Sequence, residues 1–254
     1  MSDLKIAYLI NLDRRPDRWL EFNSKASDLA MPVERFSAVD ARSLTVPGLH
    51  TPPVIAACWM SHQDVAKRFL ESNAQYCLVL EDDVALTNKT IQELNLLWKR
   101  DFREIDLLQI GFCISNDRLS NRAVYNRQVR VIDLLEKLGL LRRTMVQKIL
   151  RLAYGYNFKL FEFIALPVAE NTFELGTHSY FISRKFAEQM LCFNRPVYLP
   201  ADIAMMELAK TRKFNCYRLV RSLVAQSESP SSISNASINK LESRITEVSM
   251  EVSP

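Results

Sequence analysis

The chain lacks any long apolar run. No stretch of its 254 residues approaches the roughly eighteen consecutive apolar residues that a membrane-spanning helix needs. The apolar stretch from Ile6 to Ile10 is short and runs into Asn11 and Asp13, which is not typical of a signal peptide. We therefore expect a cytoplasmic protein that is soluble, or attached peripherally to the inner face of the cytoplasmic membrane.

Paired cysteines and a strong net charge are missing as well. The five cysteines are scattered and form no CxxC pair, which argues against a disulfide framework or a zinc site and indicates free thiols in a reducing compartment. The formal net charge of +4 is too small to indicate a nucleic-acid partner, and no recognised nucleic-acid-binding motif is present. We therefore expect no nucleic acid among the partners.

Positive charge is concentrated in one segment. Residues 117–165 hold ten Lys or Arg against four Asp or Glu, and within them 129–152 mixes basic and apolar residues. A basic amphipathic helix at an anionic membrane surface has this pattern, and so does a helical lid that packs on the core. We expect one domain over 1–225, with 117–165 as a basic helical insertion, and a Ser-rich tail over 226–254.

Strand and helix patterns alternate along the rest of the chain. Strand patterns cover 5–12, 32–39, 76–80, 105–110, 175–182 and 214–220, and helical patterns begin near 16, 54, 88, 184 and 202. This alternation predicts an α/β fold, with a mostly parallel, twisted sheet flanked by helices.

One strand ends in three acids. Tyr76 to Leu80 are apolar at every position, as in a parallel strand buried on both faces, and Glu81, Asp82 and Asp83 follow. Because buried carboxylates without partners are costly, we expect a cation beside them. Open α/β sheets bind ligands beyond the carboxyl ends of their strands, where a divalent cation carrying a diphosphate would fit. Alternatively, N-caps or arginines hold this acidic exit.

Arginines follow the first strand. The turn after Leu12 begins a helix, where free backbone N–H groups and the positive end of the helix dipole would attract an anion. Arg14 and Arg18 lie one helical turn apart and would reach a nucleotide diphosphate from there. Alternatively, they belong to a solvated helix start and pair with Asp13 and Asp17.

Three further side chains have two interpretations each. His62 lies on the apolar face of a helix, where a lone histidine is usually a hydrogen-bonded core residue. His178 follows a glycine turn into a strand, where it would be either a metal ligand or structural. Asp202 opens a helix, either as an N-cap or as a general base.

Eight short segments occur in the order found in one enzyme family. They are 8–18, 38–41, 58–62, 78–84, 106–111, 176–183, 200–202, and 223–226 with 231–233. Through them the sequence resembles glycosyltransferase family 25, the lipopolysaccharide and lipooligosaccharide galactosyltransferases and their collagen-modifying relatives. The resemblance spans nearly the whole chain apart from 117–165.

The resemblance implies a GT-A fold and metal-dependent, inverting transfer of a hexose, usually galactose from UDP-galactose, to a lipid-linked saccharide acceptor. Glu81 and Asp83 would take the outer positions of a DxD-like motif for Mn²⁺ or Mg²⁺, with His178 across the cleft and Asp202 as the base. The nucleotide-sugar pocket would be formed by Asn11, Arg14, Arg18, Asp40, Ser61, His62 and Asp82.

Other readings stay open. The family usually has a Pro-Gly-Glu-like lead into the Ser-His helix, whereas this chain has Thr51-Pro52-Pro53-Val54, which leaves UDP-glucose as an alternative donor. A sugar-nucleotide pyrophosphorylase usually has a Gly-rich loop after the first strand, and the turn at 13–16 has no glycine. The non-enzymatic alternative is a basic protein that docks on an anionic membrane surface.

Overall fold

The computed structural model describes residues 4–44, 51–100, 102–112, 158–159, 168–170, 175–211, 213–219 and 222–226. Of the expected basic insertion over 117–165 only residues 158–159 are described, and 129–152 lies wholly outside the described residues. The expected tail over 226–254 is described only at Gln226. Both therefore stay predictions.

The centre of the fold is an eight-stranded sheet of order β2-β1-β3-β8-β5-β9-β7-β6. Its strands are β1 (Lys5–Asn11), β2 (Glu34–Ser37), β3 (Tyr76–Glu81), β5 (Leu107–Gly111), β6 (Phe158–Lys159), β7 (Val168–Glu170), β8 (Ser179–Ser183) and β9 (Cys216–Leu219). Among the six neighbouring strands β2-β1-β3-β8-β5-β9, every strand but β8 runs in one direction, which confirms the expected mostly parallel sheet, and β7 beyond β9 is antiparallel to it. A separate antiparallel pair joins β4 (Val84–Ala85) to β10 (Ala225–Gln226).

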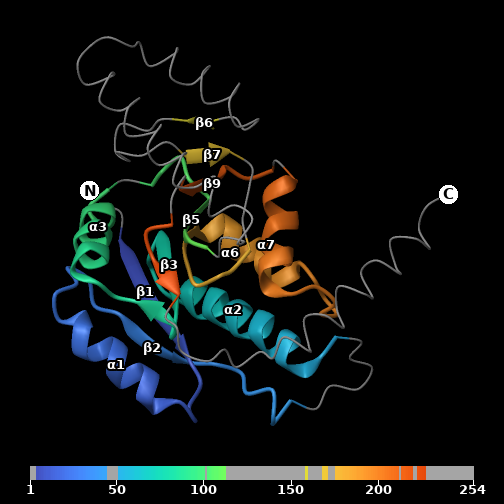
Figure 1. The fold of residues 1–254 in the computed structure, drawn as a ribbon. Helices are drawn as coiled ribbons and strands as arrows, with labels where there is room; N and C mark the ends of the chain where they lie inside the picture. The colour runs from blue at the N-terminus through green and yellow to red at the C-terminus, as the bar shows by residue number, and fades with distance from the viewer. Residues whose placement is uncertain are drawn as a thin grey trace, which may run out of the picture.

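Helices cover both faces of the sheet (Figure 1). They are α1 (Pro16–Ala26), α2 (Pro53–Glu71), α3 (Asn88–Trp98), α6 (Arg184–Cys192) and α7 (Ala201–Lys210). One apolar cluster joins the sheet to α1 and α3, and another joins it to α2, α6 and α7. Among the described residues, no helix combines the length and the apolar character needed to cross a membrane.

β3 has apolar side chains on both faces of the sheet, so both faces must be packed against helices. Its side chains alternate between the two clusters: Leu78 and Leu80 are buried with α1 and α3, whereas Cys77 and Val79 are buried with α2. Adjacent side chains of a strand point to opposite faces, so an uninterrupted apolar run requires an apolar layer on each side. The prediction of a strand buried on both faces is confirmed.

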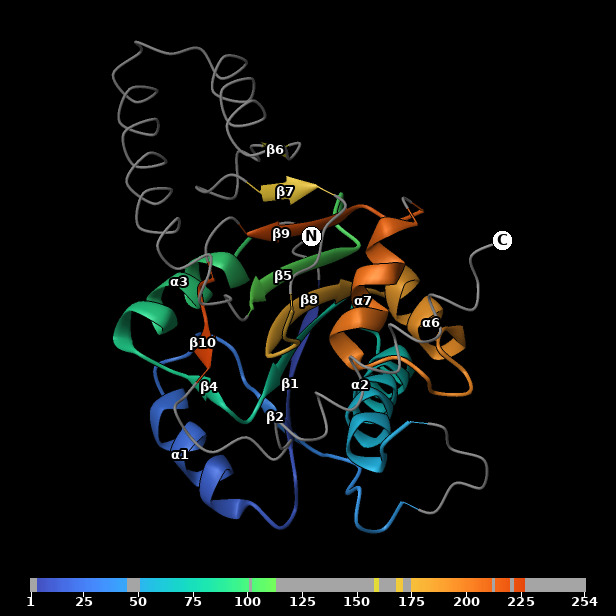
Figure 2. The ribbon, with the colours of Figure 1, turned by 45° about the vertical axis from the view of Figure 1, so that its right-hand side comes forward.

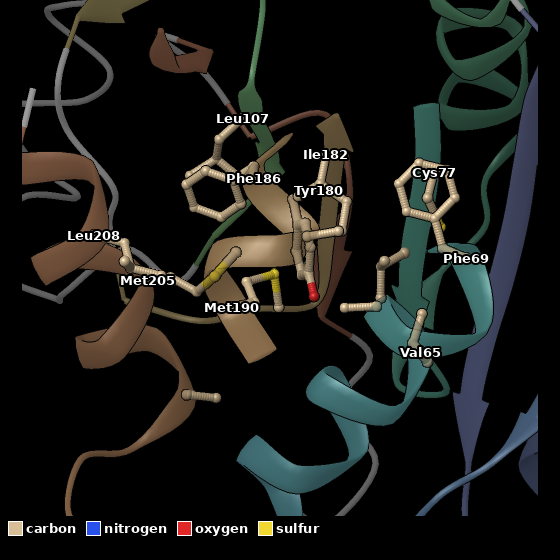
Figure 3. Close-up of a cluster of buried hydrophobic side chains, with 14 of the residues drawn as sticks. Val65, Phe69, Cys77, Leu107, Tyr180, Ile182, Phe186, Met190, Met205 and Leu208 are labelled. Carbon is tan, nitrogen blue, oxygen red and sulfur yellow. The ribbon is translucent and has the colours of Figure 1, made fainter. Parts of the chain in front are cut away.

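The cluster on the α2 side is shown in Figure 3. Phe69 of α2 lies near Cys77 of β3, while Phe186 of α6 lies between the sheet and α7. Tyr180 of β8 reaches into the same layer and places its hydroxyl oxygen toward α2. This layer fixes α2 against the sheet and thereby sets the position of the polar residues on its N-terminal half.

The reversed strand β8 brings distant residues together. It lies beside β5 (Figure 2) and between β3 and β5, and it pairs with both in the antiparallel sense. Leu80 of β3 is opposite Ser179. The ladder continues one step further, because the Glu81 N–H donates to the His178 carbonyl at 3.0 Å. The entry to β8 therefore lies beside the exit from β3, where the acids are.

Candidate active site

A cleft opens at the carboxyl ends of β1 and β3 and is bounded on one side by the N-terminal half of α2. It encloses about 720 Å³, open solvent at its mouth included. Its described lining is Ile10, Leu12, Arg14, Arg18, Ala38, Val39, Ala41, Val54, Ala57, Cys58, Ser61, His62, Glu81, Asp82 and Asp83. Five of the predicted site residues and both outer acids of the predicted metal motif therefore border one cavity.

Arg14 lies at the mouth of this cleft. Its Nε donates to the Asp40 carboxylate at 3.0 Å, and both side chains are about one-third exposed. The pKa of Asp40 is lowered, first by the backbone N–H of Arg42 and also by Arg14, which together outweigh its partial desolvation. The turn thus presents a paired cation and anion, and the predicted alternative of pairing with Asp13 and Asp17 is wrong for Arg14.

Arg18 and Asp82 form a largely buried ion pair in the wall of the cleft. Nη1 of Arg18 lies 2.7 Å from Oδ1 of Asp82, and Nδ2 of Asn11 donates to the other oxygen, also at 2.7 Å. Arg18 is 7% exposed, Asp82 11% and Asn11 1%. Asp82, the middle acid of the cluster, therefore ties the end of β3 to β1 and α1. For this one acid the alternative prediction, in which arginines hold the acidic exit of the strand, is confirmed.

Asn11 joins a second strand to this arrangement. Its Oδ1 accepts from Nε of Arg35 on β2 at 2.7 Å, and its Nδ2 also donates to the Arg15 carbonyl. Arg35 in turn contacts Asp13, which additionally accepts from the Ser37 hydroxyl. These bonds fix the turn after β1, and direct nucleotide contacts of Asn11 and Arg18 stay predictions.

Glu81 contacts both Thr177 and His62. Its Oε1 accepts from the Thr177 hydroxyl at 2.5 Å and lies 3.4 Å from Nε2 of His62. Burial alone would raise the pKa of Glu81, but hydrogen bonds and charge from His62, the charge of His178 and the Thr177 hydroxyl lower it to about 2. Glu81 is therefore held as a carboxylate.

His62 is both a core residue and part of the cleft wall. Its ring is 2% exposed, and Nδ1 lies 2.8 Å from the Tyr180 hydroxyl. The neighbouring Ser61 donates to the Ala57 carbonyl and accepts from the Val39 N–H, so it ties α2 to the loop after β2. The predicted structural interpretation of His62 and its predicted place in the wall are compatible.

The environment of Cys58 shows where negative charge gathers. This thiol lines the cleft, and burial together with the charges of Glu81, Asp202 and Asp83 raises its pKa well above the usual value. Glu81 and Asp83 border the cleft, and the charge of Asp202, which lies outside the described lining, also acts on this thiol. A cation bound there would be favoured by the same field that disfavours a thiolate.

Glu81 and Asp83 have donor atoms suited to a divalent cation. Within the described ranges, no group of three or more His, Cys, Asp or Glu side chains is arranged to hold a metal. Mg²⁺-type sites typically use one or two carboxylates, with substrate phosphates and water as the other ligands. Two carboxylates on one cleft fit that kind of site.

His178 and Asp202 lie outside the described lining of the cleft. His178 is 3% exposed, and its ring lies against the α-carbon of Gly176. Asp202 accepts from the Gly176 N–H at 3.2 Å and from the Ile203 N–H at 2.9 Å, while the N-cap position of α7 belongs to Pro200. The roles of His178 as ligand and Asp202 as base stay predictions.

Sequence reasoning did not single out Thr177, Tyr180 or Gln109. Thr177 bonds Glu81, Tyr180 bonds His62, and Gln109 donates to the Gly176 carbonyl at 2.8 Å. The available signal was the period of two in the strand, which places Tyr180 on the same face as His178. A buried glutamine inside an apolar strand, 0% exposed here, was a second signal.

Comparison with known proteins identifies the family. The family model described as glycosyltransferase family 25 (LPS biosynthesis protein) matches residues 54–205. Glycosyltransferase 25 family members of Aedes aegypti and Anopheles gambiae are each 33% identical over 95 residues, which cover 30% of this chain and 16% of the relative. A member from Drosophila pseudoobscura pseudoobscura is 28% identical over 95 residues, or 30% of this chain and 15% of the relative.

The matched stretch thus spans about a sixth of the length of these curated relatives. The family model, in contrast, covers more than half of the chain and includes α2 from its second residue, the three acids 81–83 at the end of β3, all of β8 and the start of α7. The chain belongs to glycosyltransferase family 25.

Proposed function

We propose that the chain is a glycosyltransferase that moves a hexose, galactose, from a UDP-sugar to a saccharide acceptor with inversion at the anomeric carbon. Three segments meet at one cleft and carry this proposal: the arginine turn after β1, the loop around Asp40, and the acids after β3. Family membership supports the reaction class. The donor, the metal and the acceptor are inferred from the chemistry of the cleft and from the resemblance.

Arg14 and Asp40 suit the two polar parts of a nucleotide diphosphate. The guanidinium of Arg14 is partly exposed at the mouth, where it would pair with phosphate oxygens. Asp40 is an acceptor-only carboxylate of lowered pKa and would accept hydrogen bonds from ribose hydroxyls. When the nucleotide binds, the ion pair between Arg14 and Asp40 would either break or persist while both side chains also contact the nucleotide.

Glu81 and Asp83 would hold a divalent cation, Mn²⁺ or Mg²⁺, together with the donor diphosphate. When bound, the cation would neutralise charge on the leaving diphosphate, which contributes several kcal/mol of transition-state stabilisation. The lowered pKa of Glu81 keeps this ligand ionised at neutral pH. His178 lies next to Glu81 through the backbone bond at 3.0 Å and stays a further candidate ligand.

Asp202 is the proposed base that takes the proton from the acceptor hydroxyl. Each of its oxygens accepts one backbone N–H, which fixes the carboxylate at the start of α7 and leaves a lone pair on each oxygen for a proton. A positioned base typically contributes about 10²–10⁴-fold in rate. Asp202→Asn should lose turnover in that range while UDP affinity is retained, and a rate near that of the parent chain would exclude Asp202 as the base.

The proposed acceptor is an anionic lipid-linked saccharide of the lipopolysaccharide or lipooligosaccharide type. Phe112 lies just beyond the carboxyl end of β5, five residues before the basic segment begins in the sequence, and β5 runs in the same direction as the acid-bearing β3. The chain therefore leaves β5 at the end of the sheet that carries the cleft. Flotation with anionic and neutral liposomes tests the membrane contact, and absence from both kinds would remove it.

A donor screen tests the proposal without an acceptor. UDP-galactose, UDP-glucose and UDP-N-acetylglucosamine are incubated with the protein, with and without Mn²⁺, and released UDP is measured. We expect metal-dependent hydrolysis that is fastest with UDP-galactose and lost in Asp83→Ala. Fastest hydrolysis of UDP-glucose would select the alternative donor, and no hydrolysis or UDP binding with any donor would refute the nucleotide-sugar site.

The pyrophosphorylase alternative needs its own assay. UTP and hexose 1-phosphate are supplied, and pyrophosphate is measured. The turn after β1 is closed by an Arg15 N–H to Leu12 carbonyl bond of 2.8 Å and contains no glycine. Since such enzymes cradle the triphosphate in a Gly-rich loop at this place, we expect no pyrophosphate.

A further inference from the structure

We propose that Thr177 is a positioning residue for Glu81, and that its hydroxyl holds one carboxylate oxygen so that the other is presented to the cation. The inference rests on the proposed function, because it assigns Glu81 to the metal. Thr177 is 5% exposed and does not belong to the described lining of the cleft. Its hydroxyl therefore acts through Glu81.

Thr177 engages one particular oxygen of the Glu81 carboxylate. Oε1 accepts from the Thr177 hydroxyl at 2.5 Å and lies 3.4 Å from Nε2 of His62. Among the described residues, Oε2 has no comparable contact, while the side chain borders the cleft with 24% of its area exposed. A cation held at the cleft would therefore find Oε2 as the oxygen of Glu81 that Thr177 does not engage.

The backbone on either side of Thr177 is hydrogen-bonded to neighbouring elements. Both backbone polar groups of the preceding Gly176 are bonded: its N–H donates to Asp202, and its carbonyl accepts from Gln109. The following His178 accepts from the Glu81 N–H at 3.0 Å. The segment 176–178 is thus attached to α7, β5 and β3, and the Thr177 hydroxyl has a fixed place from which to bond Glu81.

The position before Thr177 requires glycine. Gly176 has φ +94°, and a β-carbon there would lie 2.5 Å from Cε1 of the buried His178 ring. Only glycine combines this backbone angle with this contact. The chain therefore forms a tight turn that places Thr177, rather than its neighbours, over the Glu81 carboxylate.

A glutamate without this bond would rotate about its terminal torsion, which is broad and roughly two-fold. Outer contacts that orient a metal ligand are typically worth about 10–100-fold in metal affinity or activity. We therefore expect Thr177→Val to weaken Mn²⁺ binding in the presence of UDP by at least about tenfold. Thr177→Ser keeps the hydroxyl and should stay within about threefold of the parent chain.

The experiment measures Mn²⁺ binding to the full chain in the presence of UDP, from the loss of the free-ion electron paramagnetic resonance signal. Thermal unfolding without metal is recorded for each variant. Thr90→Val is the matched control, since Thr90 is 6% exposed and bonds Thr87 in the first turn of α3, outside the described cleft lining. With donor hydrolysis as a second readout, Thr177→Val should raise the Mn²⁺ concentration for half-maximal rate and leave the rate at saturating Mn²⁺ within about threefold.

Two results would overturn the inference, and they differ. If the parent chain binds Mn²⁺ with UDP and Thr177→Val binds it equally well, Thr177 does not position a metal ligand although the proposed function stands. If the parent chain does not bind Mn²⁺ with UDP, the metal part of the proposed function fails and the inference fails with it. Should Thr177→Val not fold, Thr177→Ala and Thr177→Ser decide the same question by their difference in Mn²⁺ affinity.

Discussion

Replacing Asp82 with alanine should destabilise the fold much more than its position on the cleft would suggest. Its carboxylate contacts the guanidinium of Arg18 and the amide of Asn11, each at 2.7 Å, and these three side chains are 11%, 7% and 1% exposed. Removing one partner of a buried ion pair costs about 3–5 kcal/mol, because the other charge stays in a medium that solvates it poorly. For a chain of this size, about 2–4 °C per kcal/mol converts this to a Tm lowered by about 6–20 °C.

The matched control is an ion pair of the same kind in solvent. Glu71 lies 3.6 Å from Arg68, and both side chains are 54% exposed, so Glu71→Ala should cost less than about 1 kcal/mol. Thermal unfolding of both variants is followed by far-UV circular dichroism without metal. In a double-mutant cycle, Arg18→Ala with Asp82→Ala should cost less than the two single changes added. If Asp82→Ala lowered Tm no more than Glu71→Ala, the ion pair would not hold the β3 exit and the reasoning would be refuted.

Three further outcomes follow from the same geometry. The pKa of Glu81 is lowered to about 2, below its usual 4.5, so its contribution is complete above about pH 4.5 and is lost as the pH falls toward 2; the Tm difference between the parent chain and Glu81→Gln, measured from pH 6 to 2.5, should shrink over that window. Gly176→Ala should lower the free energy of unfolding in urea by about 1–3 kcal/mol or more, because a side chain is strained at φ +94° and meets the His178 ring; Ala74→Gly, at a buried loop alanine, provides a size-matched comparison. The exposed Cys192 should react with Ellman's reagent at pH 8 far faster than the buried Cys77, whose pKa burial raises, and equal rates would contradict the burial of Cys77.

Local pattern was enough to predict most elements. The expected helix at 184–192 coincides with α6, since Ser183 caps it through the Phe186 N–H and an apolar face follows at helical spacing. The expected strand at 76–80 is β3, lengthened by Glu81. The second strand is shorter than the expected 32–39, because only Glu34–Ser37 finds partners along β1.

The direction of β8 could not be predicted from the local sequence pattern. An apolar strand has the same composition in either direction, and only its neighbours β3 and β5 determine that it runs antiparallel. The pair of β4 and β10 was missed for a related reason, since two-residue strands have no period to detect.

The side-chain pairs within the site could not be predicted from the sequence either. Its pattern indicated acids and arginines near one sheet end, but it could not assign Arg18 to Asp82 and Arg14 to Asp40, since those pairs join residues 64 and 26 positions apart. The three adjacent acids consequently have different environments that no spacing rule separates. Glu81 lies against Thr177 and His62, whereas Asp82 faces inward.

The reversed central strand has a consequence for how the chain is made. β8 is synthesised about a hundred residues after β3, yet it lies between β3 and β5 in the finished sheet. Until it emerges, those two strands have no neighbour at the sheet's centre, and unpaired strand edges invite association with other chains. A chain that stopped at residue 112 would therefore be an aggregation-prone fragment that still carries Glu81 and Asp83 but lacks both β8 and the segment 176–178 that bonds Glu81.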